Sequence, residues 1–295
     1  MPSKSQKSYR YLLVDVFTQE QFQGNQLAVF PDARGLDDAS MQRIAREFNL
    51  PEVTFVFPAS LPGCVADVRI FTPLKEMLFA GHPTIGTAYV LRSEGLVARS
   101  AEEFRLQVKV GPVPVRVDDS GGILWLKTPP IQWGKTYDAA LCAHVLGLNP
   151  GDLDARYAPQ RLSAGNPTLL VPLQTAELVD RAWLGLDGMQ RLRGDDSEPF
   201  CVFIFAPTKA GAYSRMFAPE YGIAEDPASG SATGPLGAFM KKHGLVSSAR
   251  FVSEQGAKMG RRSLLHVHIH GPDDIDVGGH VTSVGEGTIR VLNGN

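Results

Sequence analysis

A chain of 295 residues is long enough to bury a sizeable core, and at roughly 100–200 residues per domain it predicts two domains, with one large domain as the alternative. Hydrophobic residues make up 43% of the chain and charged residues 20%, and the formal net charge is −2, which is typical of an ordinary water-soluble globular protein. The 29 basic residues are outnumbered by 31 acidic ones and form no long basic run, so the composition argues against a nucleic-acid partner.

Neither the N-terminus nor the cysteines indicate export or a membrane. Residues 1–17 contain only a short apolar run, too short for a secretory core or a spanning helix, and we expect residues 1–8 to form a disordered tail. Cys64, Cys142 and Cys201 lie far apart with no CxxC spacing, which fits neither a disulfide framework nor a thiolate metal site. The sequence therefore predicts a reduced, cytoplasmic protein without a membrane span.

Apolar periodicity predicts paired strands and two helices in the N-terminal part of the chain. The first helix carries Met41, Ile44 and Phe48 at steps of three and four residues and ends before Pro51. The expected elements, in chain order, are strands at 9–17 and 24–30, a helix at 36–50, strands at 52–59 and 65–73, a helix at 81–91 and a strand at 122–127. Because the strands come in pairs rather than in a steady βαβ alternation, the expected fold class is α+β.

Two short motifs recur in the second half of the chain in the same order and at nearly the same offset. "GNQLAVF" and "GHPTIGTAYVL" in the first half correspond to "GNPTLLVPL" and "GSATGPLGAFM" in the second. This pattern predicts a duplicated unit, with chance similarity between glycine-containing segments as the alternative. Two prolines and a glycine follow the strand "GILWLK", so we expect an N-terminal half at 1–128 and a C-terminal half at 129–295.

Each of the two recurring helices starts in a turn that has the properties of an anion site. Gly81 opens the first, and Pro83 is expected at its first helical position, where a missing N–H costs nothing. Gly230 opens the second, after Asp226 and Ser229, which are both N-capping residue types. If the halves are duplicates, the two helix starts would face each other across a cleft and hold a small acid with their free N–H groups. Tight helix packing is the alternative reason for the glycines.

A glutamate is the third candidate site residue. Glu52 follows the helix at 36–50 and precedes an alternating strand, so it lies at a loop edge from which a side chain can enter a cleft. Taken alone, an ordinary surface glutamate is the simpler interpretation, because carboxylates are rarely buried.

Together these stretches resemble the PhzF-type phenazine-biosynthesis isomerase family, relatives of diaminopimelate epimerase. The similarity extends from about residue 11 to 262 and occurs in family order. The matching segments are "GNQLAVF", "MQRIAREFNLPEVTFV", "RIFTPLKEMLFAGHPTIGTA", "RMFAPEYGIAEDPASGSATGPLGAFMKKHG" and "SEQGAKMGR". The glutamate loop, the GHPT turn and the DPxSGSA turn make the resemblance specific.

The resemblance implies a diaminopimelate epimerase-like fold of two pseudo-symmetric halves, each a curled, mostly antiparallel sheet or barrel around a central helix, in a homodimer. It also implies an isomerase without a cofactor that moves a proton on a small cyclic carboxylic acid, such as a dihydro-hydroxyanthranilate. Glu52 matches the acid/base glutamate of the family. The other matching positions are His82 and Asp226 in catalysis, and Gly81, Gly230 and Ser231 in substrate binding.

Three departures from the family pattern leave the substrate open. Pro51, Leu78 and Arg262 stand next to the matching motifs where the family often has other residues. The helix starts carry no cysteine, which disfavours an amino-acid epimerase of the two-cysteine type.

A glutamate that acts as both acid and base needs a pKa above its usual value of about 4.3, which a dry cleft or Asp226 would provide. A binding protein without catalysis, and a proton-transfer enzyme for another cyclic acid, are the alternatives.

The segment "LHVHIHG" raises the question of a metal. His266, His268 and His270 alternate with Val267 and Ile269, which places the three imidazoles on one face of a strand. They could join a metal site, but no fourth ligand is fixed by the sequence, so we expect a solvent-facing strand and no metal. The glycine pairs at 121–122 and 278–279 lack a nucleotide-binding pattern, which disfavours a nucleotide enzyme.

Overall fold

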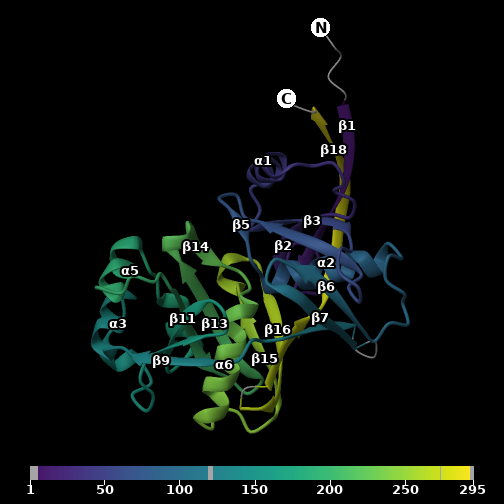
Figure 1. Ribbon diagram of the computed structural model, residues 1–295. Coiled ribbons are helices and arrows are strands. Elements are labelled where there is room, and N and C mark those ends of the chain that lie inside the picture. The colour runs from purple at the N-terminus through teal and green to yellow at the C-terminus, as the bar shows by residue number, and fades with distance from the viewer. Residues whose placement is uncertain (1–5, 119–121, 273, 293–295) are drawn as a thin grey trace. The chain divides into compact units, whose positions relative to one another are not determined.

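A computed structural model describes most of the chain (Figure 1). The described residues are 6–118, 122–272 and 274–292. They group into two compact units. Unit 1 is made from Met1–Leu126 and Gly279–Asn295, and unit 2 from Lys127–Gly278.

The last strand of the chain belongs to unit 1, which differs from a single division between residues 128 and 129. β18 (Val281–Leu292) pairs with β1 (Gln6–Val16) in an antiparallel ladder that runs from one end of β1 to the other. This long-range pairing returns the C-terminal segment to the N-terminal unit. It also places Gln6–Ser8 in β1, whereas the sequence predicts a tail there; residues 1–5 of that tail lie outside the described residues.

Unit 1 is a mostly antiparallel sheet with two parallel pairings. Its further strands are β2 (Asn25–Phe30), β3 (Glu52–Pro58), β4 (Ala66–Phe71), β5 (Glu76–Met77), β6 (Glu103–Val108), β7 (Gly111–Asp118) and β8 (Ile123–Lys127). β1 pairs with β2 antiparallel, and β2 pairs with β3 parallel. β3 and β4 are antiparallel, and β4 pairs antiparallel with β5 and parallel with β6. β6, β7 and β8 then follow as antiparallel neighbours.

Unit 2 repeats this order of pairings. Its strands are β9 (Gln132–Thr136), β10 (Gln160–Ser163), β11 (Pro167–Pro172), β12 (Cys201–Pro207), β13 (Gly211–Ala218), β14 (Ile223–Asp226), β15 (Arg250–Gln255), β16 (Ser263–Gly271) and β17 (Asp274–Gly279). The pair β11 and β12 is parallel, as is the pair β13 and β15, and the remaining neighbours are antiparallel. β9 pairs with β10, the first strand of the repeat, just as β18 pairs with β1 in unit 1. The matching order of pairings confirms the predicted duplication.

Two helices cover opposite faces of the unit 1 sheet. α1 (Asp38–Phe48) begins at Asp37, whose carboxylate accepts a hydrogen bond from the amide of Ser40, and it buries Met41 against a cluster that includes Phe30 and Phe55. α2 (Gly81–Ser93) contacts β1, β2 and β3 and is buried over most of its length. Alternate side chains of each strand reach the two helices, as the period of two requires.

Unit 2 has the same layering with more helices on its outer face. Phe239 of α6 (Gly230–Lys242) lies in one buried cluster with Phe203 and Phe205 of β12. Val202 and Ile204, which alternate with those two phenylalanines along β12, belong to a second cluster on the other face. That face carries α3 (Ala139–Val145), α4 (Ala176–Arg181) and α5 (Leu186–Arg193). Short 3₁₀ helices occupy Pro150–Asp152, Pro219–Tyr221 and Ala257–Met259.

The structure therefore confirms an α+β fold made from two similar halves, each with a mostly antiparallel sheet and one central helix. Within the described residues, every helix falls short of the length and apolar character that crossing a membrane would need.

Candidate active site

The first half of α2 is held tightly against the sheet of unit 1. A Cβ on Gly86 would lie 2.5 Å from Cδ2 of Leu27 and 2.9 Å from Cγ2 of Val16, so only glycine allows the helix to approach β1 and β2 this closely. The helix begins at Gly81, and Pro83 is its third residue rather than its first. The amides of Gly81 and His82 therefore have no acceptor within the helix, and they carry the partial positive charge of the helix start.

Glu52 and His82 meet at this helix start. Asn49, in a left-handed conformation with φ of 49°, ends α1 and turns the chain into β3, whose first residue is Glu52. The parallel pairing with β2 sets Glu52 opposite Leu27. Oε2 of Glu52 then lies 3.4 Å from Nε2 of His82, and the two side chains are only 14% and 7% exposed.

His82 is a neutral imidazole at neutral pH. Burial lowers its pKa to about 3, against the smaller raising effect of a hydrogen bond to the backbone of Gln26. A hydrogen bond that raises the pKa of an imidazole is one that the ring donates. The His82 ring therefore donates an N–H to the backbone carbonyl of Gln26. Nε2 has no hydrogen-bond partner among the described residues, so the donated proton is on Nδ1 and Nε2 presents a lone pair towards Glu52.

The start of α6 in unit 2 is organised by a different set of side chains. The hydroxyl of Ser229, the residue before the helix, donates a short hydrogen bond to Oδ2 of Asp226 at the end of β14. Gln255 links the same groups, because its Nε2 donates to the Asp226 carbonyl at 2.7 Å and to Ser229 Oγ at 3.0 Å. Its Oε1 accepts the Ser229 amide at 3.1 Å. Ser229 thus orients a carboxylate, where the sequence predicts an ordinary capping residue.

Gly256 supports this cluster from the end of β15. It has a positive φ of 74°, and a Cβ there would lie 2.4 Å from the Arg261 carbonyl oxygen and 2.6 Å from that of Pro227. Glycine is needed at this position for both reasons. The turn keeps Gln255 next to the segment that precedes α6.

The predicted site residues therefore occupy two helix starts. Glu52, His82 and Gly81 lie at the start of α2 in unit 1. Asp226 lies just before α6 in unit 2, and Gly230 and Ser231 form its first turn, both partly exposed. Their catalytic and binding roles stay predictions.

Sequence reasoning did not single out two residues that orient these clusters, Gln26 and Gln255. Both lie within segments that had been recognised, "GNQLAVF" and "SEQGAKMGR". Gln26 acts through its backbone, which leaves no side-chain signal. Gln255 is fully buried, and a buried side-chain amide needs hydrogen-bond partners. The sequence alone does not show which residues those partners are.

The residues that depart from the family pattern have ordinary surroundings. Leu78 is 60% exposed, just before the start of α2. Arg262 forms an ion pair with Glu254 at 2.7 Å. Neither Leu78 nor Arg262 brings an acid/base group to the position that Glu52 occupies.

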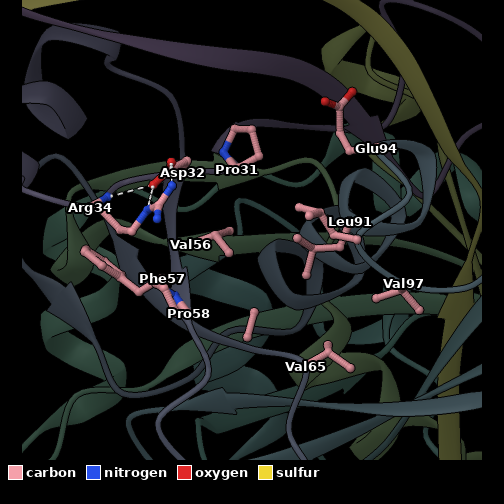
Figure 2. Close-up of a pocket in the computed structure, with 12 residues that line it drawn as sticks. Pro31, Asp32, Arg34, Val56, Phe57, Pro58, Val65, Leu91, Glu94 and Val97 are labelled. Atoms are coloured by element: carbon pink, nitrogen blue, oxygen red, sulfur yellow. Dashed lines mark hydrogen bonds and ion pairs between the residues drawn. The ribbon is translucent and has the colours of Figure 1, made fainter.

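Unit 1 also contains a pocket of about 410 Å³, shown with its lining residues in Figure 2. Its walls include Val56, Phe57 and Leu91, and none of the predicted site residues lines it. The charged groups that line it are paired: Asp32 with Arg34, as Figure 2 shows, and Glu94 with Arg10. The pocket is therefore not the candidate active site.

The chain is similar to known proteins over most of its length. The sequence pattern of the family described as phenazine biosynthesis-like protein (PhzC-PhzF) matches residues 14–287. A trans-2,3-dihydro-3-hydroxyanthranilate isomerase of Pseudomonas aeruginosa is 31% identical, over 95% of this chain and 98% of its own. An uncharacterized isomerase of Mesorhizobium japonicum is 35% identical, over 95% and 98% of the two chains.

Solved structures show the same fold. The phenazine biosynthesis protein of the PhzF family from Bacillus anthracis has a TM-score of 0.85 and 26% identity, covering 96% of this chain and 99% of that one. A hydroxyproline epimerase from Agrobacterium vitis, at 14% identity and a TM-score of 0.64, shares the fold alone.

The fold and the named relatives define an isomerase with a diaminopimelate epimerase-like architecture. The phenazine biosynthesis-like family is the one to which this chain belongs.

Proposed function

We propose that the protein moves a proton between two positions of a small cyclic carboxylic acid, with Glu52 as the group that carries it. The observation that supports this most directly is the largely covered carboxyl group of Glu52, 3.4 Å from the neutral imidazole of His82. The substrate class follows the relatives whose names specify trans-2,3-dihydro-3-hydroxyanthranilate. The reaction needs neither oxidant nor reductant, because the proton that leaves one carbon returns to another.

His82 suits an orienting role beside Glu52 in this proposal. Its Nε2 lies 3.4 Å from Oε2 of Glu52, so the neutral imidazole is placed to position the carboxyl group that carries the proton. Contacts between catalytic groups are often long before substrate binds and tighten in the complex.

The helix starts supply the groups for substrate binding in this proposal. The amides of Gly81 and His82, and those of Gly230 and Ser231, suit a carboxylate, since each pair lies at the positive end of a helix dipole. Asp226, oriented by Ser229 and Gln255, suits an amino or hydroxyl group that donates to a carboxylate.

Proton NMR in D₂O tests the proposal directly. Wild type incubated with trans-2,3-dihydro-3-hydroxyanthranilic acid is expected to convert it with incorporation of deuterium. Glu52→Gln should keep the circular dichroism spectrum and lose turnover by about 10²–10⁴-fold, the usual contribution of a general acid/base. Glu47→Gln, at an exposed position on α1, is the matched control and should convert at the wild-type rate.

Other outcomes would lead to the alternative functions. Solvent exchange into a different cyclic acid that depends on Glu52 would keep the mechanism and replace the substrate. Ligand binding that survives Glu52→Gln, with no exchange into any acid, would indicate a binding protein and refute the enzymatic proposal.

We also propose a cytoplasmic homodimer, on the basis of the family resemblance and the free thiols. Size-exclusion chromatography with light scattering tests the assembly, and a mass of 32.0 kDa in solution would contradict it.

A further inference from the structure

The histidine-containing strand β16 divides its side chains as the sequence predicts. Val267 and Ile269 are buried in the cluster that surrounds α6, while His266 and His268 are half-buried and His270 is exposed. Thus the imidazoles lie on the face of β16 that points away from α6.

Strand pairing adds a buried carboxylate to this row. β17 runs antiparallel to β16, and Asp276 stands directly opposite His268. Asp276 is only 2% exposed, and its Oδ2 lies 2.6 Å from Nε2 of His270. The rings of His268 and His270 have centroids 3.8 Å apart. One donor atom from each of the three residues lies within 4.8 Å of the others.

We propose that His268, His270 and Asp276 bind a late first-row divalent metal ion, with Zn²⁺ as the representative. Two imidazoles and one carboxylate form a donor set that such ions prefer, and three protein ligands leave a position for water. Ligand atoms about 2.0–2.2 Å from an ion are a little over 3 Å apart, so the 2.6 Å contact opens slightly and the remaining separations shorten on binding.

The geometry favours a metal over a simple histidine–aspartate pair because three side chains converge. A single hydrogen bond uses only His270 and Asp276, whereas a shared ion would use His268 as well. Asp274, the other acidic residue of β17 as the structure describes it, pairs with Lys127 at 2.9 Å, so Asp276 would be the anionic ligand.

The proposed site is separate from the candidate catalytic groups of its own unit. Val267 and Ile275 pack beneath Gly237 of α6, so the sheet lies between that helix and the imidazole row. A bound ion would hold β16 to β17 and stabilise this pair of strands, without a part in proton transfer.

Metal binding by the intact chain, freed of any affinity tag and dialysed against a chelator, tests the proposal. Isothermal titration with ZnCl₂ is expected to give one Zn²⁺ per chain, and the Tm should rise by about 2–4 °C for each tenfold excess over Kd. Co²⁺ in place of Zn²⁺ should develop visible absorption bands of a low-coordinate site. No saturable binding of either ion by the wild type would overturn the proposal.

Variants identify the ligands. Loss of a residue that only supports a metal ligand typically weakens binding by about 10–100-fold. We expect a larger loss of Zn²⁺ affinity from each change of a ligand itself: His268→Asn, His270→Asn and Asp276→Asn. His266→Asn is the matched control, since it changes an imidazole on the same face of the same strand but outside the three-residue cluster, and its affinity should equal that of wild type. An equal loss in His266→Asn, or unchanged binding in the triple variant, would refute this ligand set.

Discussion

The buried imidazole of His82 makes the stability of unit 1 depend on pH. The folded-state pKa is about 3, whereas an unfolded histidine titrates near 6.5. The unfolded state therefore binds more protons between these values, so the contribution is complete above pH 6.5 and is lost as the pH falls towards 3. From pH 7 to pH 5 the loss amounts to about 2 kcal/mol of the free energy of unfolding, with a slope approaching about 1.4 kcal/mol per pH unit.

Urea unfolding of wild type and His82→Gln between pH 5 and pH 7.5 measures this term. The variant lacks the titrating group, so its stability relative to wild type should improve by about 2 kcal/mol on going from pH 7 to pH 5. His144→Gln, an exposed histidine on α3, is the control and should follow the wild-type pH dependence. A difference between wild type and His82→Gln that stays constant across this range would refute a buried neutral histidine.

Three further predictions concern unit 2 and the thiols. Gln255→Leu should raise KM about 10-fold with a smaller loss in kcat, because it removes hydrogen bonds that orient Asp226, the proposed partner of a substrate amino or hydroxyl group; an unchanged KM would contradict its positioning role. Gly256→Ala should lower the free energy of unfolding by at least about 2 kcal/mol in urea, since its φ is positive and its Cβ would meet backbone, and a neutral effect would show that the turn relaxes. Burial raises the pKa of Cys142 and Cys201 to about 12, so Ellman's reagent at pH 8 should label Cys64 alone in the native state and all three thiols in urea.

Most elements with strong local signals could be predicted from the sequence. The helix predicted at 36–50 is α1, and the strands predicted at 24–30 and 52–59 are β2 and β3, each within two residues at its ends. Their apolar periods reflect the two-faced burial that the structure shows. The duplication was also readable, because both repeats need the same small residues where a helix approaches the sheet.

What the sequence did not reveal depends on long-range pairing. The return of β18 to β1 brings together segments at opposite ends of the chain, and no local pattern specifies that register. The same holds for Asp276, whose place beside His268 follows only from the pairing of β16 with β17. The helices α3, α4 and α5 are six to eight residues long and give a weak periodic signal.

The pairing of β18 with β1 also affects the order in which the chain can fold during synthesis. Unit 2 is one continuous stretch, whereas unit 1 needs its final strand from the C-terminal end. At about 5–20 residues per second, the ribosome produces that strand about 10–30 s after β8. During this interval β1 has an unpaired edge, so the nascent N-terminal unit is the part of the chain that most needs protection from aggregation.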